Sequence, residues 1–106
     1  MDVLNLGFVP GKRITQACGL VQGCCVQSKH IGRDIAAGIK GIFGGELRGY
    51  TELLEESRTT AMKRMIEQAK KMRADAIINV RFTTSAIAPG ACELFCYGTA
   101  VKTQDE

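Results

Sequence analysis

The sequence contains no apolar run long enough to cross a membrane as a helix. The longest candidate, residues 35–45, is short and includes Lys40, whereas a membrane span needs about 20 apolar residues. The first eight residues include Asp2 and no basic residue, so they do not match the basic start of a signal peptide. These two absences predict a cytoplasmic protein with no membrane partner.

The cysteine spacing of a disulfide framework is also missing. The chain has 5 cysteines, an odd number, and no CxxC motif. Small secreted domains that depend on disulfides carry an even number of cysteines at regular spacing. We therefore expect reduced thiols, as in other cytoplasmic proteins.

The chain has few aromatic residues and only a small excess of positive charge. The formal net charge is +3, and aromatic residues make up 6% of the chain. The one basic cluster lies at the C-terminal end of a predicted helix, where it complements the helix dipole; it contains Lys63, Arg64, Lys70, Lys71 and Arg73. No aromatic residue is placed by the pattern as a stacking platform for bases. The sequence thus predicts no nucleic-acid partner.

The length and composition are those of one globular domain, residues 1–106. A chain of 11.5 kDa buries roughly 60–70% of its unfolded surface, which is enough for a core without disulfides or metals. Hydrophobic residues make up 45% and charged residues 24% of the chain, as in ordinary soluble domains.

Residues 46–73 carry the clearest periodic signal. Apolar residues recur at intervals of three, four or seven positions and form one stripe: Leu47, Tyr50, Leu54, Ala61, Met65, Ala69 and Met72, widened by Leu53, Met62 and Ile66. This period predicts a long amphipathic helix. A second helical period begins at Ile31 and ends at the pair Gly44–Gly45. Glycines inside that second helix suggest the close approach of another backbone.

Three segments rich in β-branched and aromatic residues are predicted to be strands, namely residues 14–22, 76–83 and 92–101. The last two flank Pro89–Gly90, a turn signal that predicts an antiparallel hairpin. The order strand, helix, helix, strand, strand predicts an α+β fold, with a small antiparallel sheet and helices packed on one face.

The last predicted strand has two partly apolar faces. Leu94, Cys96, Gly98 and Ala100 alternate with Phe95, Tyr97, Thr99 and Val101. A small sheet with apolar residues on both faces and open edges needs more partners than one chain supplies. We therefore expect a homo-oligomer, assembled as a closed symmetric ring.

Several motifs, in order over residues 14–103, resemble the YbjQ-like family of small prokaryotic proteins. They are Lys29–Asp34, Phe43–Glu46, Tyr50–Arg58, Ala74–Ile77, Arg81–Ser85 and Tyr97–Val101. The resemblance implies a dodecin-subunit-like fold, assembled as a homopentamer in bacteria. It also brings the label "putative heavy-metal-binding", with no established reaction. Two departures are Arg73, where relatives often have glycine, and the pair Cys24–Cys25, where they often have other small or polar residues.

The candidate metal ligands are Cys24, Cys25 and His30, which lie within seven residues of one another. Thiolate and imidazole together suit a soft ion such as Zn²⁺ or Cu⁺. Neighbouring cysteines chelate one ion poorly, so a site would need thiols that converge from several subunits. The alternative is that the two cysteines pack at a strand end and His30 begins the helix. Cys92 and Cys96 are expected to be packing thiols beside Leu94.

No catalytic constellation is visible in the sequence. His30 and Asp34 lie one helical turn apart, but no nucleophile or pocket accompanies them. The segment Gly41–Gly45 lacks the Gly-Lys-Ser/Thr ending of a phosphate-binding loop. Three functions stay open: a homo-oligomer that binds a soft metal or small ligand between subunits, a structural or partner-binding ring without metal, and an unrecognised enzyme. We favour the first of these functions. We also predict that the protein is not an enzyme.

Overall fold

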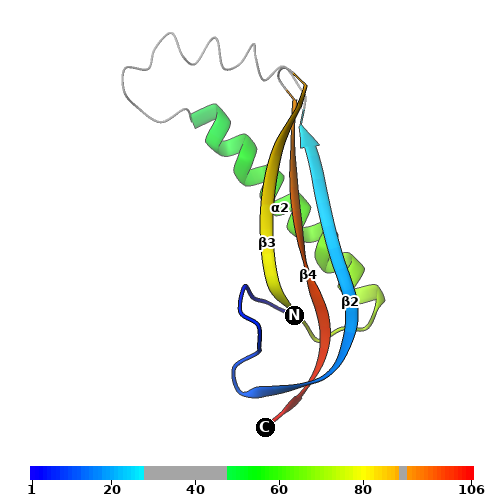
Figure 1. The fold of residues 1–106 in the computed structure, drawn as a ribbon. Helices are drawn as coiled ribbons and strands as arrows, with labels where there is room; N and C mark the ends of the chain where they lie inside the picture. The colour runs from blue at the N-terminus through cyan, green and yellow to red at the C-terminus, as the bar shows by residue number, and fades with distance from the viewer. Residues whose placement is uncertain (28–47, 89–90) are drawn as a thin grey trace.

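A four-stranded sheet and one long helix make up the described residues, which are 1–27, 48–88 and 91–106 of the computed structural model (Figure 1). In chain order the elements are β1 (Asp2–Val3), β2 (Lys12–Gln27), α2 (Arg48–Lys71), β3 (Ala76–Ala88) and β4 (Ala91–Asp105). The strands lie in the order β1-β3-β4-β2. This arrangement confirms the predicted α+β class.

The three predicted strands are present, and each is longer than its sequence pattern indicated. β3 and β4 form the predicted antiparallel hairpin, whose register ends at the pair Ala88 and Ala91; Pro89–Gly90 lie outside the described residues. β2 pairs antiparallel with β4 along its whole length. Irregularities in the register, such as the one between Ile78 and Arg81, interrupt the alternation from which strand ends were predicted.

The prediction of a purely antiparallel sheet was wrong at one edge. β1 pairs parallel with β3, so the sheet is mixed. The N-terminal segment continues along β3, because the Leu4 N–H donates to the Ile77 carbonyl at 2.8 Å and the Val80 N–H donates to the Leu4 carbonyl at 3.0 Å. A strand of two residues is too short for any periodic pattern, so only long-range pairing could reveal it.

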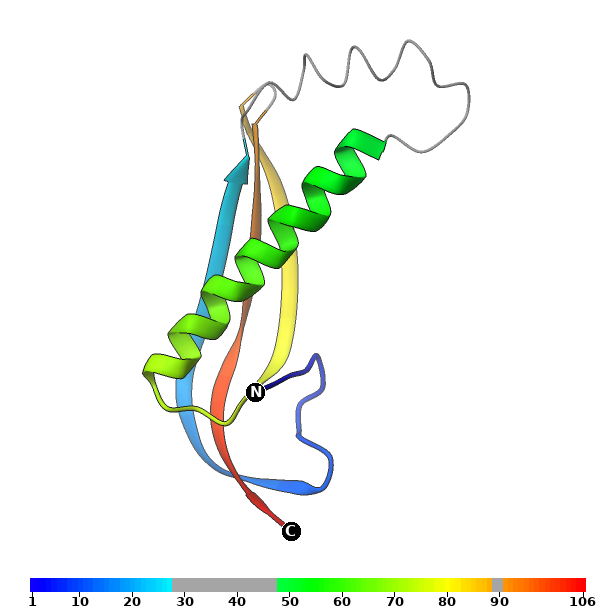
Figure 2. The ribbon, with the colours of Figure 1, turned by 180° about the vertical axis from the view of Figure 1, so that it is seen from behind.

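Helix α2 crosses one face of the sheet diagonally and packs mainly on β2 and β4 (Figure 2). The centre of the predicted stripe is confirmed, since Ala61, Met65 and Ala69 are fully buried against the sheet. Met72 is 39% exposed because α2 has already ended. The other predicted helix, which begins at Ile31, lies outside the described residues.

Gly23 brings α2 into direct contact with the backbone of β2. A side-chain carbon at this position would overlap the Ala61 carbonyl oxygen and lie 2.7 Å from the Met65 nitrogen. The helix presents small or flexible residues here, which allows the two elements to approach closely. This contact fixes the position of α2 over the sheet.

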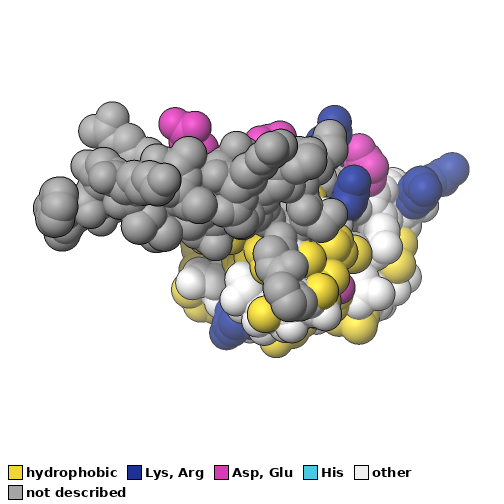
Figure 3. Space-filling view, turned by 90° about the horizontal axis from the view of Figure 1, so that it is seen from above, with side chains coloured by type: hydrophobic (Ala, Val, Ile, Leu, Met, Phe, Trp, Pro, Cys, Tyr) yellow, Lys and Arg dark blue, Asp and Glu magenta, His cyan; other side chains and the backbone are white. Residues whose placement is uncertain are grey.

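The opposite face of the sheet, which we call the uncovered face, has no helix over it among the described residues (Figure 1). At its lower end the N-terminal segment covers a small second core made of Val9, Ala76, Ile78 and Val101, with Leu4 against it. Above this core no other described segment covers the face. Seen from above, most charged side chains lie along the helix side, and hydrophobic side chains show on the opposite side (Figure 3).

Helix α2 ends in a left-handed cap at Arg73, whose φ is 58°. The Arg73 N–H donates to the Lys70 carbonyl at 3.0 Å, and the Ala74 N–H donates to the Ala69 carbonyl at 3.1 Å. This is the Schellman pattern, in which glycine is the usual residue at the left-handed position. Arg73 therefore adopts a conformation that costs about 1 kcal/mol more than it would for glycine.

The protein is elongated, with extents of 56 × 25 × 16 Å and a radius of gyration of 17.3 Å. The predicted ring and the dodecin-like resemblance stay predictions.

Candidate functional site

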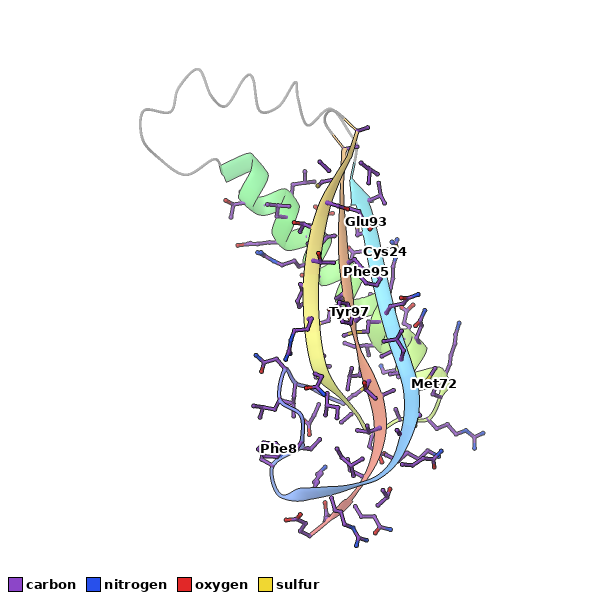
Figure 4. All side chains as sticks on the ribbon, viewed as in Figure 1. Phe8, Cys24, Met72, Glu93, Phe95 and Tyr97 are labelled. Atoms are coloured by element: carbon purple, nitrogen blue, oxygen red, sulfur yellow. The ribbon has the colours of Figure 1, made fainter. Side chains whose placement is uncertain are left out.

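The two neighbouring cysteines lie on opposite faces of β2. Cys25 is 4% exposed and belongs to the core under α2, whereas Cys24 is exposed on the uncovered face (Figure 4). Successive residues of a strand point to opposite faces, so one ion cannot bridge both thiols within a chain. His30, the third predicted ligand, lies outside the described residues, and the site of three ligands stays a prediction.

Cys24 lies in a small hollow at the edge of the sheet. The hollow has a volume of ≈ 250 Å³ and is lined by Gln22, Gly23, Cys24, Arg64, Gln68 and Phe95. Two side chains of α2 reach around the edge of β2 at this point. Arg64 Nη1 donates to the Cys24 carbonyl oxygen at 2.6 Å, and the Gln22 N–H donates to Gln68 Oε1 at 2.9 Å. The backbone of Gln22 and Cys24 is therefore bonded to side chains of α2.

A pair of aromatic rings lies next to Cys24 on the uncovered face. Phe95 is directly opposite Cys24 in the register of β2 and β4. Its ring stacks on that of Tyr97, with centroids 5.5 Å apart and planes at 29° (Figure 4). The sequence pattern predicted no platform of aromatic residues. The alternation of apolar residues in the last strand was the signal, because it places Phe95 and Tyr97 on one face.

The prediction that both cysteines of β4 are buried packing thiols holds for Cys96, which lies in the core, but not for Cys92, which is only half-buried. Cys96 is fully buried, and Cys18 and Cys92 are half-buried. Burial raises the pKa of the Cys96 thiol, a backbone hydrogen bond from Gly23 opposes this, and the nearby Cys24 raises it further. Its burial and its raised pKa both disfavour the accessible thiolate that a metal ion needs.

A complete metal site is not formed by the described part of one chain. No group of three or more His, Cys, Asp or Glu residues is arranged there to hold an ion. Of the five cysteines, Cys24 is the exposed one. This donor fits a soft ion only if further ligands come from other copies or from outside the described residues.

A larger groove lies on the helix side, between α2 and β3. Its volume is ≈ 840 Å³, and Met62, Ile66 and Phe82 form its apolar part. The remaining lining residues are polar or charged: Glu55, Arg58, Thr59, Lys63, Glu67 and Lys70. The groove exists because α2 crosses towards β2 and leaves β3 uncovered. No sequence pattern predicted it, since it depends on the crossing angle of the helix.

No helix in the described ranges has the length and apolar character needed to span a bilayer. The candidate dyad of His30 and Asp34 and the glycine-rich segment Gly41–Gly45 lie outside the described residues. Among the described residues, the candidate metal site is therefore the uncovered face, with Cys24 at its edge.

The sequence model of the YbjQ family matches residues 1–104, and its description is "Putative heavy-metal-binding". The chain belongs to the YbjQ family. Its members include proteins named UPF0145 from bacteria. One from Hahella chejuensis is 62% identical over 101 residues, which cover 95% of this chain and 97% of that protein. One from Fervidobacterium nodosum is 52% identical over 102 residues, covering 96% of this chain and 94% of that protein.

Another YbjQ relative, UPF0145 protein VP1283 from Vibrio parahaemolyticus, is 56% identical over 94 residues, covering 89% of this chain and 90% of that protein. None of these names states an enzymatic activity. The fold resembles the crystal structure of a DUF74-family protein of unknown function from Pediococcus pentosaceus. The TM-score is 0.66 at 15% sequence identity, and the match covers 98% of each chain. That likeness concerns the fold alone.

Proposed function

We propose that this YbjQ-family protein is a homo-oligomeric binding protein in which Cys24 thiols of neighbouring copies hold a soft metal ion such as Cu⁺. The observation that carries the proposal is the position of Cys24, an exposed thiol at the edge of an uncovered sheet face. The family description, "Putative heavy-metal-binding", agrees with a thiolate site. A reducing cytoplasmic location is part of the proposal, because oxidation of Cys24 would remove the ligand.

A metal ion would have to be shared between copies because one chain offers too few ligands. A single thiolate cannot complete the coordination of a soft ion, and the described part of one chain offers no cluster of three or more ligands. Copies that meet on the uncovered face would bring their Cys24 thiols together. His30 stays a candidate ligand on sequence grounds alone.

Exposed apolar side chains support self-association. Leu20 is 64% exposed, Val26 49% and Tyr97 37%. Exposed apolar patches favour contact with another chain. A ring of five copies is the assembly that the family resemblance implies, without nucleic acid or membrane as partner.

The test is native mass spectrometry of reduced protein loaded with Cu⁺, comparing Cys24→Ser with Cys25→Ala. Cys25→Ala removes a thiol from the other face of the same strand and is the matched control. We expect wild type and Cys25→Ala to form oligomers that bind copper. We expect Cys24→Ser to form an oligomer with the same number of chains but without bound copper. Copper binding that is unchanged in Cys24→Ser would rule out the proposed site.

A second candidate function is a ring that binds a partner without metal. The apolar groove between α2 and β3 favours it, because the groove offers a docking surface independent of any thiol. Oligomers that take up no copper, in wild type and in both variants alike, would favour this candidate.

A further inference from the structure

The groove between α2 and β3 has the size and the apolar lining of a small-molecule site. Its volume of ≈ 840 Å³ lies within the range of about 300–1,000 Å³ that ligand pockets occupy. Met62, Ile66 and Phe82 line it, and we call these three residues the apolar floor. Met62 and Ile66 pack against the core and are only half-buried, and Phe82 is 41% exposed. The floor is therefore held in place by the core and still has apolar surface that a ligand could cover.

Helix α2 borders this apolar floor with charged side chains. Residues four apart on a helix lie next to each other on its surface. One such row of the groove lining places the two apolar residues of α2 between two cations: Arg58, Met62, Ile66 and Lys70. The neighbouring row includes Lys63 and Glu67. A ligand that covers the floor therefore comes within reach of charged groups of α2.

The C-terminal end of the groove has an excess of positive charge. From Arg58 to the end of α2 there is one acidic residue, Glu67, whereas the basic residues are Arg58, Lys63, Arg64, Lys70 and Lys71. Glu67 has a cation at each of its neighbouring positions on the helix surface, three and four residues before and after it. One carboxylate cannot neutralise four cations, so this end of the groove attracts an anion.

The helix dipole accounts for only some of these cations. Its effect is confined to the last turn of a helix, and the basic residues in the last turn of α2 are Lys70 and Lys71. Lys63 lies about two turns before the end of the helix. Its side chain is exposed and lines the groove beside the apolar floor. Lys63 therefore adds positive charge where the dipole does not require it.

We infer that this groove binds an elongated anionic amphiphile, namely a free carboxylate with an apolar chain. The chain covers the apolar floor, and the carboxylate lies at the basic end of the groove, beside Lys63 and Lys70. Because the charges at that end are mostly positive, a cationic amphiphile with the same chain is disfavoured. The inference rests on the second candidate function, whose docking surface is this groove, and is independent of the metal proposed at Cys24.

Methyl NMR of the methionines tests the position of the ligand, because the chain has 4 methionines and one of them, Met62, lines the groove. The probe is decanoate, kept below its micelle concentration. We expect decanoate to shift the Met62 signal until it saturates. Met65, which is fully buried under α2, and Met72, which lies beyond the end of α2, should keep their signals.

The charge of the head group is tested with decyltrimethylammonium, which carries a cation on a chain of the same length. We expect it to bind about fivefold more weakly than decanoate, as exposed charge contacts allow. Equal affinity for the two probes would overturn the inference, and so would a Met62 signal that decanoate leaves unchanged.

The cations are tested in the double variant Lys63→Gln/Lys70→Gln, which should raise the dissociation constant of decanoate about fivefold. Lys12→Gln/Lys71→Gln is the matched control, because it removes the same charge at two exposed positions that do not line the groove. The control should keep the wild-type affinity. An equal loss of affinity in both double variants would show an effect of net charge and would overturn the site.

Copper binding, measured on the same samples, separates this inference from the metal proposal. Cys24→Ser should bind decanoate as wild type does, because the thiol does not line this groove. A decanoate shift at Met62 in a protein that takes up no copper supports the ligand and rejects the metal. Copper uptake through Cys24 without any shift of Met62 overturns the ligand and leaves the metal proposal standing.

Discussion

At the scale of single residues, the surroundings of each thiol decide what that thiol can do. Cys24 and Cys25 are adjacent in the chain, yet one is exposed beside Arg64 and the other is buried under α2. Cys96 is buried on the helix side, and burial raises its pKa. Among the five cysteines, Cys24 is the exposed one, so its thiol is the most accessible to a metal ion.

The raised pKa of Cys96 predicts a loss of stability in alkaline solution. In the unfolded chain this thiol ionises near its ordinary value of 9.0, whereas in the folded protein it keeps its proton to higher pH. Above this value the folded state therefore binds more protons than the unfolded state, and the free energy of unfolding falls as the pH rises. Below it, the contribution of Cys96 is constant.

Urea unfolding of wild type and Cys96→Ala, measured from about pH 8 to about pH 10.5, tests this expectation. Cys96→Ala should lower stability at all pH values and show a smaller alkaline decrease. Cys92→Ala, at a half-buried thiol of the same strand, should keep the full decrease. Equal pH slopes in wild type and Cys96→Ala would contradict the assignment.

At the scale of elements, the contact between α2 and β2 depends on the absence of a side chain at Gly23. The atoms nearest to that position are backbone atoms of Ala61 and Met65, which cannot move without shifting the helix. The buried residues of α2 in this contact include Ser57, Ala61 and Ala69. Small residues on both elements let the helix lie close to the sheet, as close packing of interiors requires.

Gly23→Ala is therefore expected to lower the free energy of unfolding by about 3 kcal/mol, because an added methyl group overpacks the contact. Gly7→Ala is the matched control, since its added carbon would lie 3.5 Å from the Asn79 side chain, an ordinary contact. The control should change stability by less than about 0.5 kcal/mol. Urea denaturation measures both, and similar values for the two variants would contradict the packing account.

At the scale of the whole molecule, the described chain is an elongated sheet with α2 on one face and no described helix on the other. Side chains of α2 bond to the Gln22 N–H and the Cys24 carbonyl on the outer edge of β2. We call this part the closed edge, because an edge whose peptide groups are occupied does not accept another strand.

Opening the closed edge should therefore change the assembly. In the double variant Arg64→Ala/Gln68→Ala, the outward groups of Gln22 and Cys24 lose their partners. We expect light scattering to detect species heavier than the wild-type assembly, or precipitation at the same protein concentration. Glu56→Ala/Lys71→Ala, at two exposed positions of the same helix, is the control and should match wild type. A double variant with wild-type mass would show that these side chains do not restrict growth.

Much of the architecture was predictable from local patterns. The stripe through Ala61, Met65 and Ala69 predicted α2, because a helical period needs only neighbouring turns of the chain. The alternation in the last strand predicted two partly apolar faces, and the structure places Leu94 and Cys96 on the buried one. The candidate site was predictable only in part, because the pattern singled out Cys24 and not Arg64, Gln68 or Phe95.

By itself the sequence determined the α+β class, the long helix, the hairpin of β3 and β4, and membership of the YbjQ family. These features depend on residues close together in the chain or on the order of motifs along it. Only the tertiary structure decided that β1 is parallel to β3, that α2 crosses towards β2, and that α2 closes one edge of the sheet. Those outcomes depend on contacts such as Gln22 with Gln68 and Cys24 with Arg64, which lie 46 and 40 residues apart. No local pattern carries such contacts, since they form only when the helix lies on the sheet.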